Sequence, residues 1–167
     1  MTRTGSVWSS EESGNRIFVN VPDKKEIEVI DGTQLAVLAR WPVTSAQGNF
    51  PMALDEAHHR LFVATWTPSL MLVFDTETGK EIASGEDAGP SDDLFYDSSR
   101  DRIYVLTSAG FLEVFQGGDH NHYDKIGHYP TPLHTQTGLF VPEWGKLFAT
   151  AQGQGELSAE IRVYKAN

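Results

Sequence analysis

Four polar residues in loops between predicted strands have side chains suited to a divalent cation or a small ligand, namely Asn49, Asp92, Asp93 and His134. Carboxylate and amide oxygens together with an imidazole form a ligand set that such cations accept. Asp92 and Asp93 are therefore the first metal candidates. The same residue types also form side-chain hydrogen bonds to the backbone in turns and at strand starts, so a structural role is the alternative.

A second candidate metal site is the segment Asp119-His120-Asn121-His122. Alternate residues of an extended segment can point the same way, which would let His120 and His122 share a transition metal. The alternative is an ordinary solvated loop. No cofactor is predicted beyond a divalent cation at one of these two places.

The sequence contains no motif for a cysteine or serine nucleophile. The chain has no cysteine, which excludes a thiolate nucleophile and a sulfur-ligated metal. No Gly-x-Ser-x-Gly elbow is present to expose a catalytic serine. Trp66, in the loop Trp66-Thr-Pro, could stack a ligand if exposed, with packing between sheets as its alternative role. The sequence thus offers binding residues and leaves the catalytic residues unknown.

Charge and hydropathy restrict the partners. The 167 residues include 23 acidic and 13 basic side chains, giving a net charge of −10 that repels phosphate backbones. Nucleic acid is therefore not an expected partner. No segment has the length of a membrane span, and the first residues lack the apolar stretch of a secretory signal. We expect a soluble chain, and its location stays open.

A repeat determines the predicted fold. Arg16-Ile-Phe-Val, Arg60-Leu-Phe-Val, Arg102-Ile-Tyr-Val and Lys146-Leu-Phe-Ala follow one another at spacings of 44, 42 and 44 residues. Such a period is the mark of a repeat architecture. We divide the chain, as one domain, into repeats at about residues 6–46, 47–88, 89–133 and 134–167.

Each of these runs is the predicted second strand of its repeat. Further β-type runs lie before and after it. The first runs are Ser6-Val-Trp-Ser, Pro51-Met-Ala-Leu-Asp, Asp93-Leu-Phe-Tyr-Asp and Gly138-Leu-Phe-Val. The third runs are Glu26-Ile-Glu-Val-Ile-Asp, Leu70-Met-Leu-Val-Phe-Asp, Phe111-Leu-Glu-Val-Phe-Gln and Glu160-Ile-Arg-Val-Tyr-Lys. The fourth runs are Leu35-Ala-Val-Leu-Ala, Lys80-Glu-Ile-Ala-Ser and Tyr123-Asp-Lys-Ile-Gly, and the last repeat has none.

Four strands in every forty-odd residues predict an all-β fold, a β-propeller segment of four blades whose last blade lacks its outermost strand. The second strands are continuous apolar runs, which fits sheets covered on both faces. An up-and-down barrel is the alternative, and it would need a differently filled inner face. In a propeller the loops between repeats lie at one end, where loop-borne ligand sites are common.

The second strands resemble the Tyr-Val-Thr-Asn element of YVTN-type, YncE-like β-propeller repeat proteins. Val73-Phe-Asp-Thr-Glu-Thr-Gly-Lys is similar to that family's strand and turn, in which an Asp opens the turn to the fourth strand. The resemblance covers residues 6 to 165. It implies a ring of about seven blades in full-length members, so this chain resembles the C-terminal half of one.

These features predict a non-catalytic binding or interaction module. Its expected partners are a second copy of the chain, another protein or a small ligand. One alternative is a metal-assisted hydrolase of a lactone or similar ester, in which Asn49, Asp92 and Asp93 hold the cation. The other alternative is a fragment without independent function.

Overall fold

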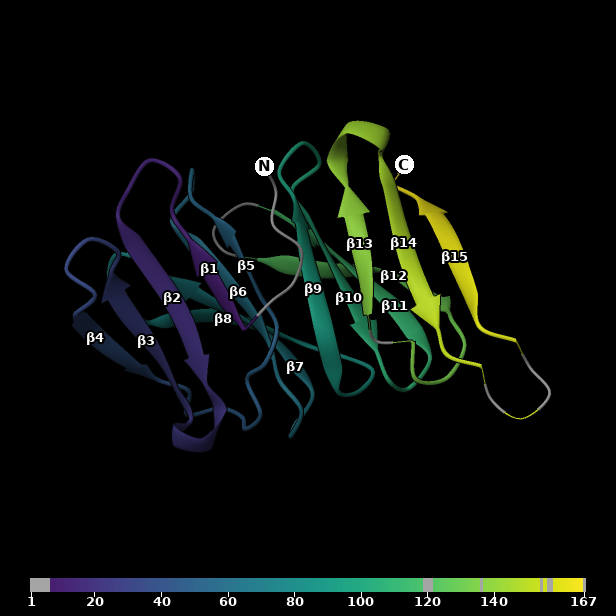
Figure 1. Cartoon of the computed structure of the whole chain (residues 1–167), viewed down its shortest axis with the longest axis horizontal. Helices are drawn as coiled ribbons and strands as arrows, with labels where there is room; N and C mark the ends of the chain where they lie inside the picture. Colours follow the sequence, from purple (N-terminus) through teal and green to yellow (C-terminus); the bar gives the residue numbers. More distant parts are fainter. Residues whose placement is uncertain (1–6, 119–121, 136, 154, 156–157, 167) are drawn as a thin grey trace.

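The computed structural model describes residues 7–118, 122–135, 137–153, 155 and 158–166. These residues form four antiparallel sheets that follow one another along the chain and stand side by side (Figure 1). We call the sheets blades 1 to 4 in chain order. The predicted propeller segment with three strands in its last blade is confirmed, and the barrel alternative is wrong because the strands form separate sheets.

Within each blade, the order of the strands in space is their order in the sequence. Blades 1 and 2 contain β1 (Trp8–Ser10), β2 (Arg16–Val21), β3 (Glu26–Asp31), β4 (Val37–Pro42), β5 (Met52–Asp55), β6 (Arg60–Ala64), β7 (Leu70–Asp75) and β8 (Glu81–Glu86). Blades 3 and 4 contain β9 (Ser91–Asp97), β10 (Arg102–Thr107), β11 (Phe111–Gly117), β12 (Tyr123–Pro130), β13 (Thr137–Val141), β14 (Lys146–Ala151) and β15 (Glu160–Lys165).

The predicted strands begin within two residues of these bounds, and the largest shifts are at β1, β4 and β9, with β9 beginning at Ser91 before the predicted Asp93. The four second strands are β2, β6, β10 and β14, as the repeat spacing predicts. The fourth strand of blade 1 begins at Val37, two residues later than predicted. Leu35 is part of the preceding turn, with a positive φ of 54° and its N–H bonded to the Asp31 carbonyl. That Asp opens the turn, because its Oδ1 accepts backbone hydrogen bonds from Thr33 and Gln34.

Burial of the strands follows the position of each blade. In blade 2, which has a neighbour on both sides, Leu61, Phe62, Val63 and Ala64 are all buried. In blade 1, the burial of β2 and β3 alternates between buried and half-buried positions. Only one face of blade 1 is covered, and alternate residues of a strand point to opposite faces. Continuous burial along a strand therefore marks the inner blades, although blade 1 also has the apolar run Ile17-Phe18-Val19.

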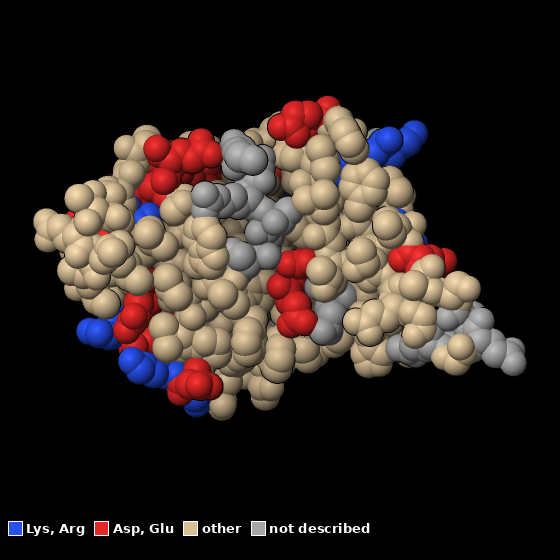
Figure 2. All heavy atoms as spheres, in the orientation of Figure 1, with Lys and Arg blue, Asp and Glu red and all other residues tan. Residues whose placement is uncertain are grey.

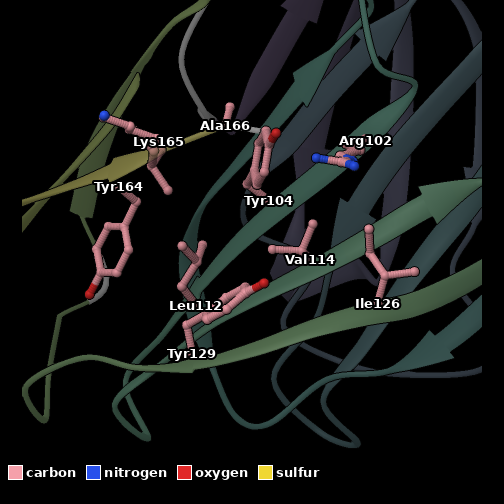
Figure 3. Close-up of a pocket in the computed structure, with 10 residues that line it drawn as sticks. Arg102, Tyr104, Leu112, Val114, Ile126, Tyr129, Tyr164, Lys165 and Ala166 are labelled. Carbon is pink, nitrogen blue, oxygen red and sulfur yellow. The ribbon is translucent and has the colours of Figure 1, made fainter. Parts of the chain in front are cut away.

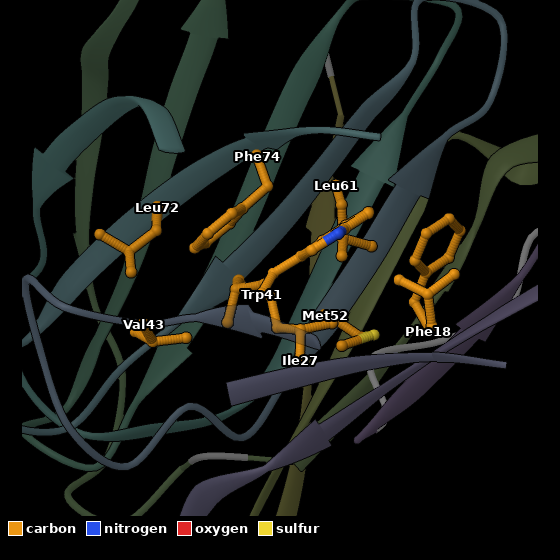
Figure 4. Close-up of a cluster of buried hydrophobic side chains, with 10 residues drawn as sticks. Phe18, Ile27, Trp41, Val43, Met52, Leu61, Leu72 and Phe74 are labelled. Atoms are coloured by element: carbon orange, nitrogen blue, oxygen red, sulfur yellow. The ribbon is translucent and has the colours of Figure 1, made fainter. Parts of the chain in front are cut away.

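The core consists of three hydrophobic clusters, one in each seam between adjacent blades. In the seam of blades 1 and 2, Phe18 and Trp41 lie with ring centroids 5.5 Å apart and face Leu61 and Phe74 (Figure 4). The Trp41 ring leaves no room for a side chain at Gly79, where a Cβ would lie 2.3 Å from the indole nitrogen. A large residue on one blade is thus matched by a glycine on the next.

We expect Phe62→Ala to lower the free energy of unfolding by about 3–5 kcal/mol, because the change opens a cavity in a closed seam. Phe62 is fully buried, and its ring centroid lies 5.0 Å from that of Tyr96 in the next blade. Leu38→Ala is the control, since Leu38 is 57% exposed, and it should change stability by about 0.5 kcal/mol or less. Urea unfolding measures both, and equal effects would contradict the assignment of Phe62 to the core.

Candidate functional site

The two ends of the propeller segment differ in the connections they carry. Strand direction alternates within each blade, so the connections between blades and those between second and third strands meet at one end, the loop end. The turn end carries the turns after the first strands. In Figure 1 the loop end lies below and the turn end above. The predicted residues Asn49, Trp66, Asp92, Asp93 and His134 belong to connections or strand starts at the loop end.

Asn49 joins blades 1 and 2 through hydrogen bonds. Its side chain is fully buried, and Nδ2 donates to Asn20 Oδ1 at 2.8 Å and to the Glu26 carbonyl at 3.1 Å. Asn20 Nδ2 in turn donates to the Phe50 carbonyl at 2.9 Å. The side-chain amides of Asn49 and Asn20 therefore both form hydrogen bonds between blades 1 and 2. Asn49 Oδ1 has no hydrogen-bond partner among the described residues.

Trp66 joins blade 2 to blade 3 at the same end. Its ring stacks on Phe50 with centroids 4.3 Å apart, and Nε1 donates to the Ser91 carbonyl at 3.1 Å. The side chain is still 39% exposed. One part of the indole is thus fixed by the seam while another part faces solvent, as a ligand-stacking residue requires.

Asp93 connects blade 3 to blade 4. It is 8% exposed, and Oδ2 accepts a hydrogen bond of 2.7 Å from the Gly138 N–H. Burial raises the pKa of this carboxyl to about 7, the Gly138 hydrogen bond opposes the rise, and the neighbouring charge of Asp92 adds to it. Asp92 itself is half-buried. The structure therefore gives Asp93 a role between blades and a pKa near neutrality.

The histidines of the two predicted metal sites lie apart from these contacts. His134 is exposed, and its backbone N–H donates to the Ser108 carbonyl. His122 is exposed and lies 2.9 Å from Asp124 Oδ1, whereas His120 lies outside the described residues. Within the described part of the chain, no group of three or more His, Asp or Glu side chains is placed to hold a metal ion.

A buried polar cluster between blades 2 and 3 was not predicted. Glu113 is fully buried, with Oε1 2.8 Å from His128 Nδ1 and Oε2 3.2 Å from Lys125 Nζ. Burial is the main cause that raises the pKa of nearby Asp87 to about 7, and the charge of Glu113 contributes to the rise. One signal for this cluster was present in the sequence. Glu113 is a charged residue at the position where blade 2 has the apolar Leu72.

An acidic cavity of about 520 Å³ lies at the turn end, where blades 1, 2 and 3 meet. Acidic side chains gather along that end of the face shown in Figure 2. The carboxylates are hydrogen-bonded within the protein. Glu56 accepts from the backbone N–H groups of Glu12 and Ser13, and Asp55 accepts from the Tyr96 hydroxyl at 2.9 Å. These bonds give the carboxylates a role in joining the blades.

A second hollow, of about 320 Å³, opens between blades 3 and 4. Tyr104, Leu112 and Tyr129 line it from blade 3, and Tyr164 and Lys165 line it from blade 4 (Figure 3). We call it the seam groove. Its lining is mainly aromatic and aliphatic with a basic side chain, a composition typical of sites that bind apolar groups.

Blade 4 also presents an apolar outer face. Leu139, Phe148 and Val163 pair across the sheet in one row, and Trp144 packs edge-on against Phe148. Leu139 is 47% exposed and Val163 is 52% exposed. Beside this row, Ile161 is exposed on the same face. Exposed apolar patches on proteins commonly mark interaction sites.

The outer face of blade 1 is more polar. Arg40 Nε lies 3.0 Å from Glu28 Oε1 and 3.6 Å from Glu26 Oε1, so ion pairs cover its outer half. Ile17 and Val19 are half-buried on the inner half of that face. The two ends of the segment therefore present different but partly apolar faces.

Comparison with solved structures gives three informative neighbours. Hydrazine synthase of Kuenenia stuttgartiensis matches with a TM-score of 0.81 and 14% identity, over 96% of this chain and 46% of that one. A chain of the mitotic checkpoint complex matches with a TM-score of 0.76 and 10% identity, over 94% and 48%. BamB from Moraxella catarrhalis matches with a TM-score of 0.67 and 12% identity, over 95% and 42%.

The fold is a β-propeller. At these identities the likeness shows the fold alone, and this chain spans about half the length of the proteins it matches. No family model matches the sequence, and neither does any curated protein. Among the described residues, no helix has the length and apolar character needed to cross a membrane.

The raised pKa of Asp93 predicts a specific pH dependence of stability. Because the folded protein favours the protonated carboxyl, its contribution is present at low pH and is lost as the pH rises from about 4 to about 7. Asp93→Asn keeps an acceptor for Gly138 and removes the charge. Relative to the wild type it should gain about 1 kcal/mol between pH 5 and pH 8, after allowance for solvent screening.

Urea unfolding at pH 5 and pH 8 measures this gain. Asp92→Asn is the matched control, since it removes the same charge from the adjacent, half-buried position. The control should retain most of the wild-type pH dependence. Identical pH dependence in the Asp93→Asn variant and the wild type would show that Asp93 does not titrate in this range.

Proposed function

We propose that this chain is a non-catalytic interaction module, built from YVTN-type propeller repeats, whose outermost blades bind protein. The outer face of blade 4 is the observation that carries the proposal. Its row Leu139, Phe148 and Val163 stands where blade 3 has Phe95, Tyr104 and Val114. In blade 3 this row is 1–5% exposed because blade 4 covers it.

A sheet face with this apolar composition is stabilised when another surface covers it. At about 25 cal/mol per Å², burial of several hundred Å² of apolar surface stabilises an association by many kcal/mol before the cost of immobilising the partners. Blades 1, 2 and 3 each bury the equivalent row against the next blade. We infer that another sheet covers the row of blade 4.

A second copy of the chain offers one such sheet. The outer face of its blade 1 carries Ile17 and Val19, which correspond to Leu61 and Val63 on the covered face of blade 2. Two copies related by a twofold axis would complete a ring of about eight blades, since each copy supplies four. We propose this self-association as the simplest way to cover both faces.

The hydrolase alternative has no comparable support. It needs Asn49, Asp92 and Asp93 to hold one cation. Asn49 instead hydrogen-bonds to blade 1, and Asp93 hydrogen-bonds to blade 4. Because the two side chains serve different seams, we propose the interaction module as the function.

Light scattering and sedimentation of the purified chain test the proposal. We expect a mass above 18.5 kDa that rises with concentration. Val163→Glu should weaken the association at least tenfold, because it would bury an unpaired charge in the interface. Leu133→Glu is the control, since Leu133 is 62% exposed in a loop away from the outer face, and it should leave the mass unchanged.

A monodisperse 18.5 kDa species that binds no hydrophobic dye would contradict self-association. It would show that the row on blade 4 is stable in water without a covering sheet. Association that Val163→Glu leaves unchanged would place the interface elsewhere on the chain.

A further inference from the structure

Blade 4 has three strands among the described residues, whereas each of the other blades has four. In blades 1 to 3 a fourth strand pairs with the third, whereas β15 has no such neighbour among the described residues. An edge strand presents unpaired backbone N–H and C=O groups, which makes it a template for another strand. Added strands of this kind are a common mode of peptide recognition.

The seam groove lies beside this edge. Tyr129 and Ile126, on β12, form its outer part and are 51% and 48% exposed. Figure 3 shows Leu112 beside Tyr129, with Tyr164 on the blade 4 side. A strand added to β15 would run over the open side of this groove, because the third and fourth strands of a blade are neighbours.

Blade 2 shows what a covered version of this surface looks like. Ile82 and Ile126 are equivalent, since each is the extra residue at the register shift of its fourth strand. Ile82 is half-buried and packs against the cluster between blades 2 and 3, where β12 contacts β8. Ile126 is 48% exposed, and no fourth strand among the described residues covers it. The groove is thus the unfilled place of that strand.

The fourth strand of blade 3, β12, shows which side chains of such a strand contact the neighbouring blade. Tyr123, at its start, contacts Phe62 of blade 2 edge-on, and Lys125 lies over the Phe115 ring at 5.5 Å. Between them, Asp124 pairs with Gln116. An aromatic residue at the start of the strand therefore seals the seam.

The same register on β15 specifies the ligand further. Tyr164 and Lys165 correspond to Phe115 and Gln116, so a residue in the place of Asp124 would lie opposite Lys165. Lys165 is exposed at this position. Its basic side chain favours an acidic residue opposite it in the ligand.

We propose that the edge of β15 and the seam groove bind an extended segment of a partner polypeptide as the fourth strand of blade 4. The segment carries an aromatic residue followed by an acidic one. This inference rests on the proposed interaction function, but it concerns the edge of β15 and the seam groove, whereas the proposed function concerns the row Leu139, Phe148 and Val163.

A peptide with the sequence of residues 123–130, Tyr-Asp-Lys-Ile-Gly-His-Tyr-Pro, is the probe. Labelled with a fluorophore, it should bind the wild-type chain in anisotropy titrations and slow hydrogen exchange in residues 160–165. Ile126→Ser should weaken binding by about tenfold, because it removes part of the groove wall. Leu38→Ser, at an exposed position of blade 1, is the matched control and should bind normally.

A charge exchange gives a second, independent arm. Lys165→Glu should weaken binding of the peptide by about tenfold, and a peptide with Lys in place of its Asp should bind that variant better than the wild type. Lys165 is exposed, so this arm stays informative if Ile126→Ser fails to fold. Failure of the exchanged pair to recover binding would overturn the assigned register.

Three results would overturn the proposal. The peptide does not bind the wild-type chain, or it binds without protecting residues 160–165, or Ile126→Ser lowers the mass of a self-associated species, which would make a second copy the occupant. Failure here is separable from failure of the proposed function. A chain that associates through Val163 but ignores the peptide retains the function and loses only this inference.

Discussion

Packing of one sheet face against the next is the interaction on which the rest of this molecule depends. Each blade has an apolar row on the face toward its successor, such as Ala53, Phe62 and Val73 in blade 2, and that row is buried only when the next blade is present. A single blade has no core of its own. Stability, binding surfaces and exposed edges therefore all follow from which faces find a neighbour.

The polar residues of the loop end serve this same packing. Asn49, Trp66 and Asp93 each hydrogen-bond across a different seam, which supplies partners to polar atoms that the packing of the blades removes from water. These hydrogen bonds give all three side chains a structural role. The raised pKa of Asp93 is a consequence of its place in the seam, and it links the contact between blades 3 and 4 to pH.

Blade 4 repeats the pattern of the other blades without their coverage. Its outer row is apolar like theirs and stands exposed, and its β15 has a free edge among the described residues. The two surfaces differ in what they fit, because a sheet face takes another sheet and a strand edge takes an extended segment. One blade therefore exposes two surfaces with different geometry and chemistry.

The sequence by itself determined the repeat, the strand positions and the propeller class, because the spacing of β-forming runs and the alternation of side chains are local properties of the chain. It also placed Asn49, Trp66 and Asp93 at one end. Only the tertiary structure decided which partners these residues meet, since hydrogen bonds such as Asp93 to Gly138 join positions 45 residues apart. The cluster around Glu113 and the seam groove likewise exist only where separate blades approach one another, so no local pattern could reveal them.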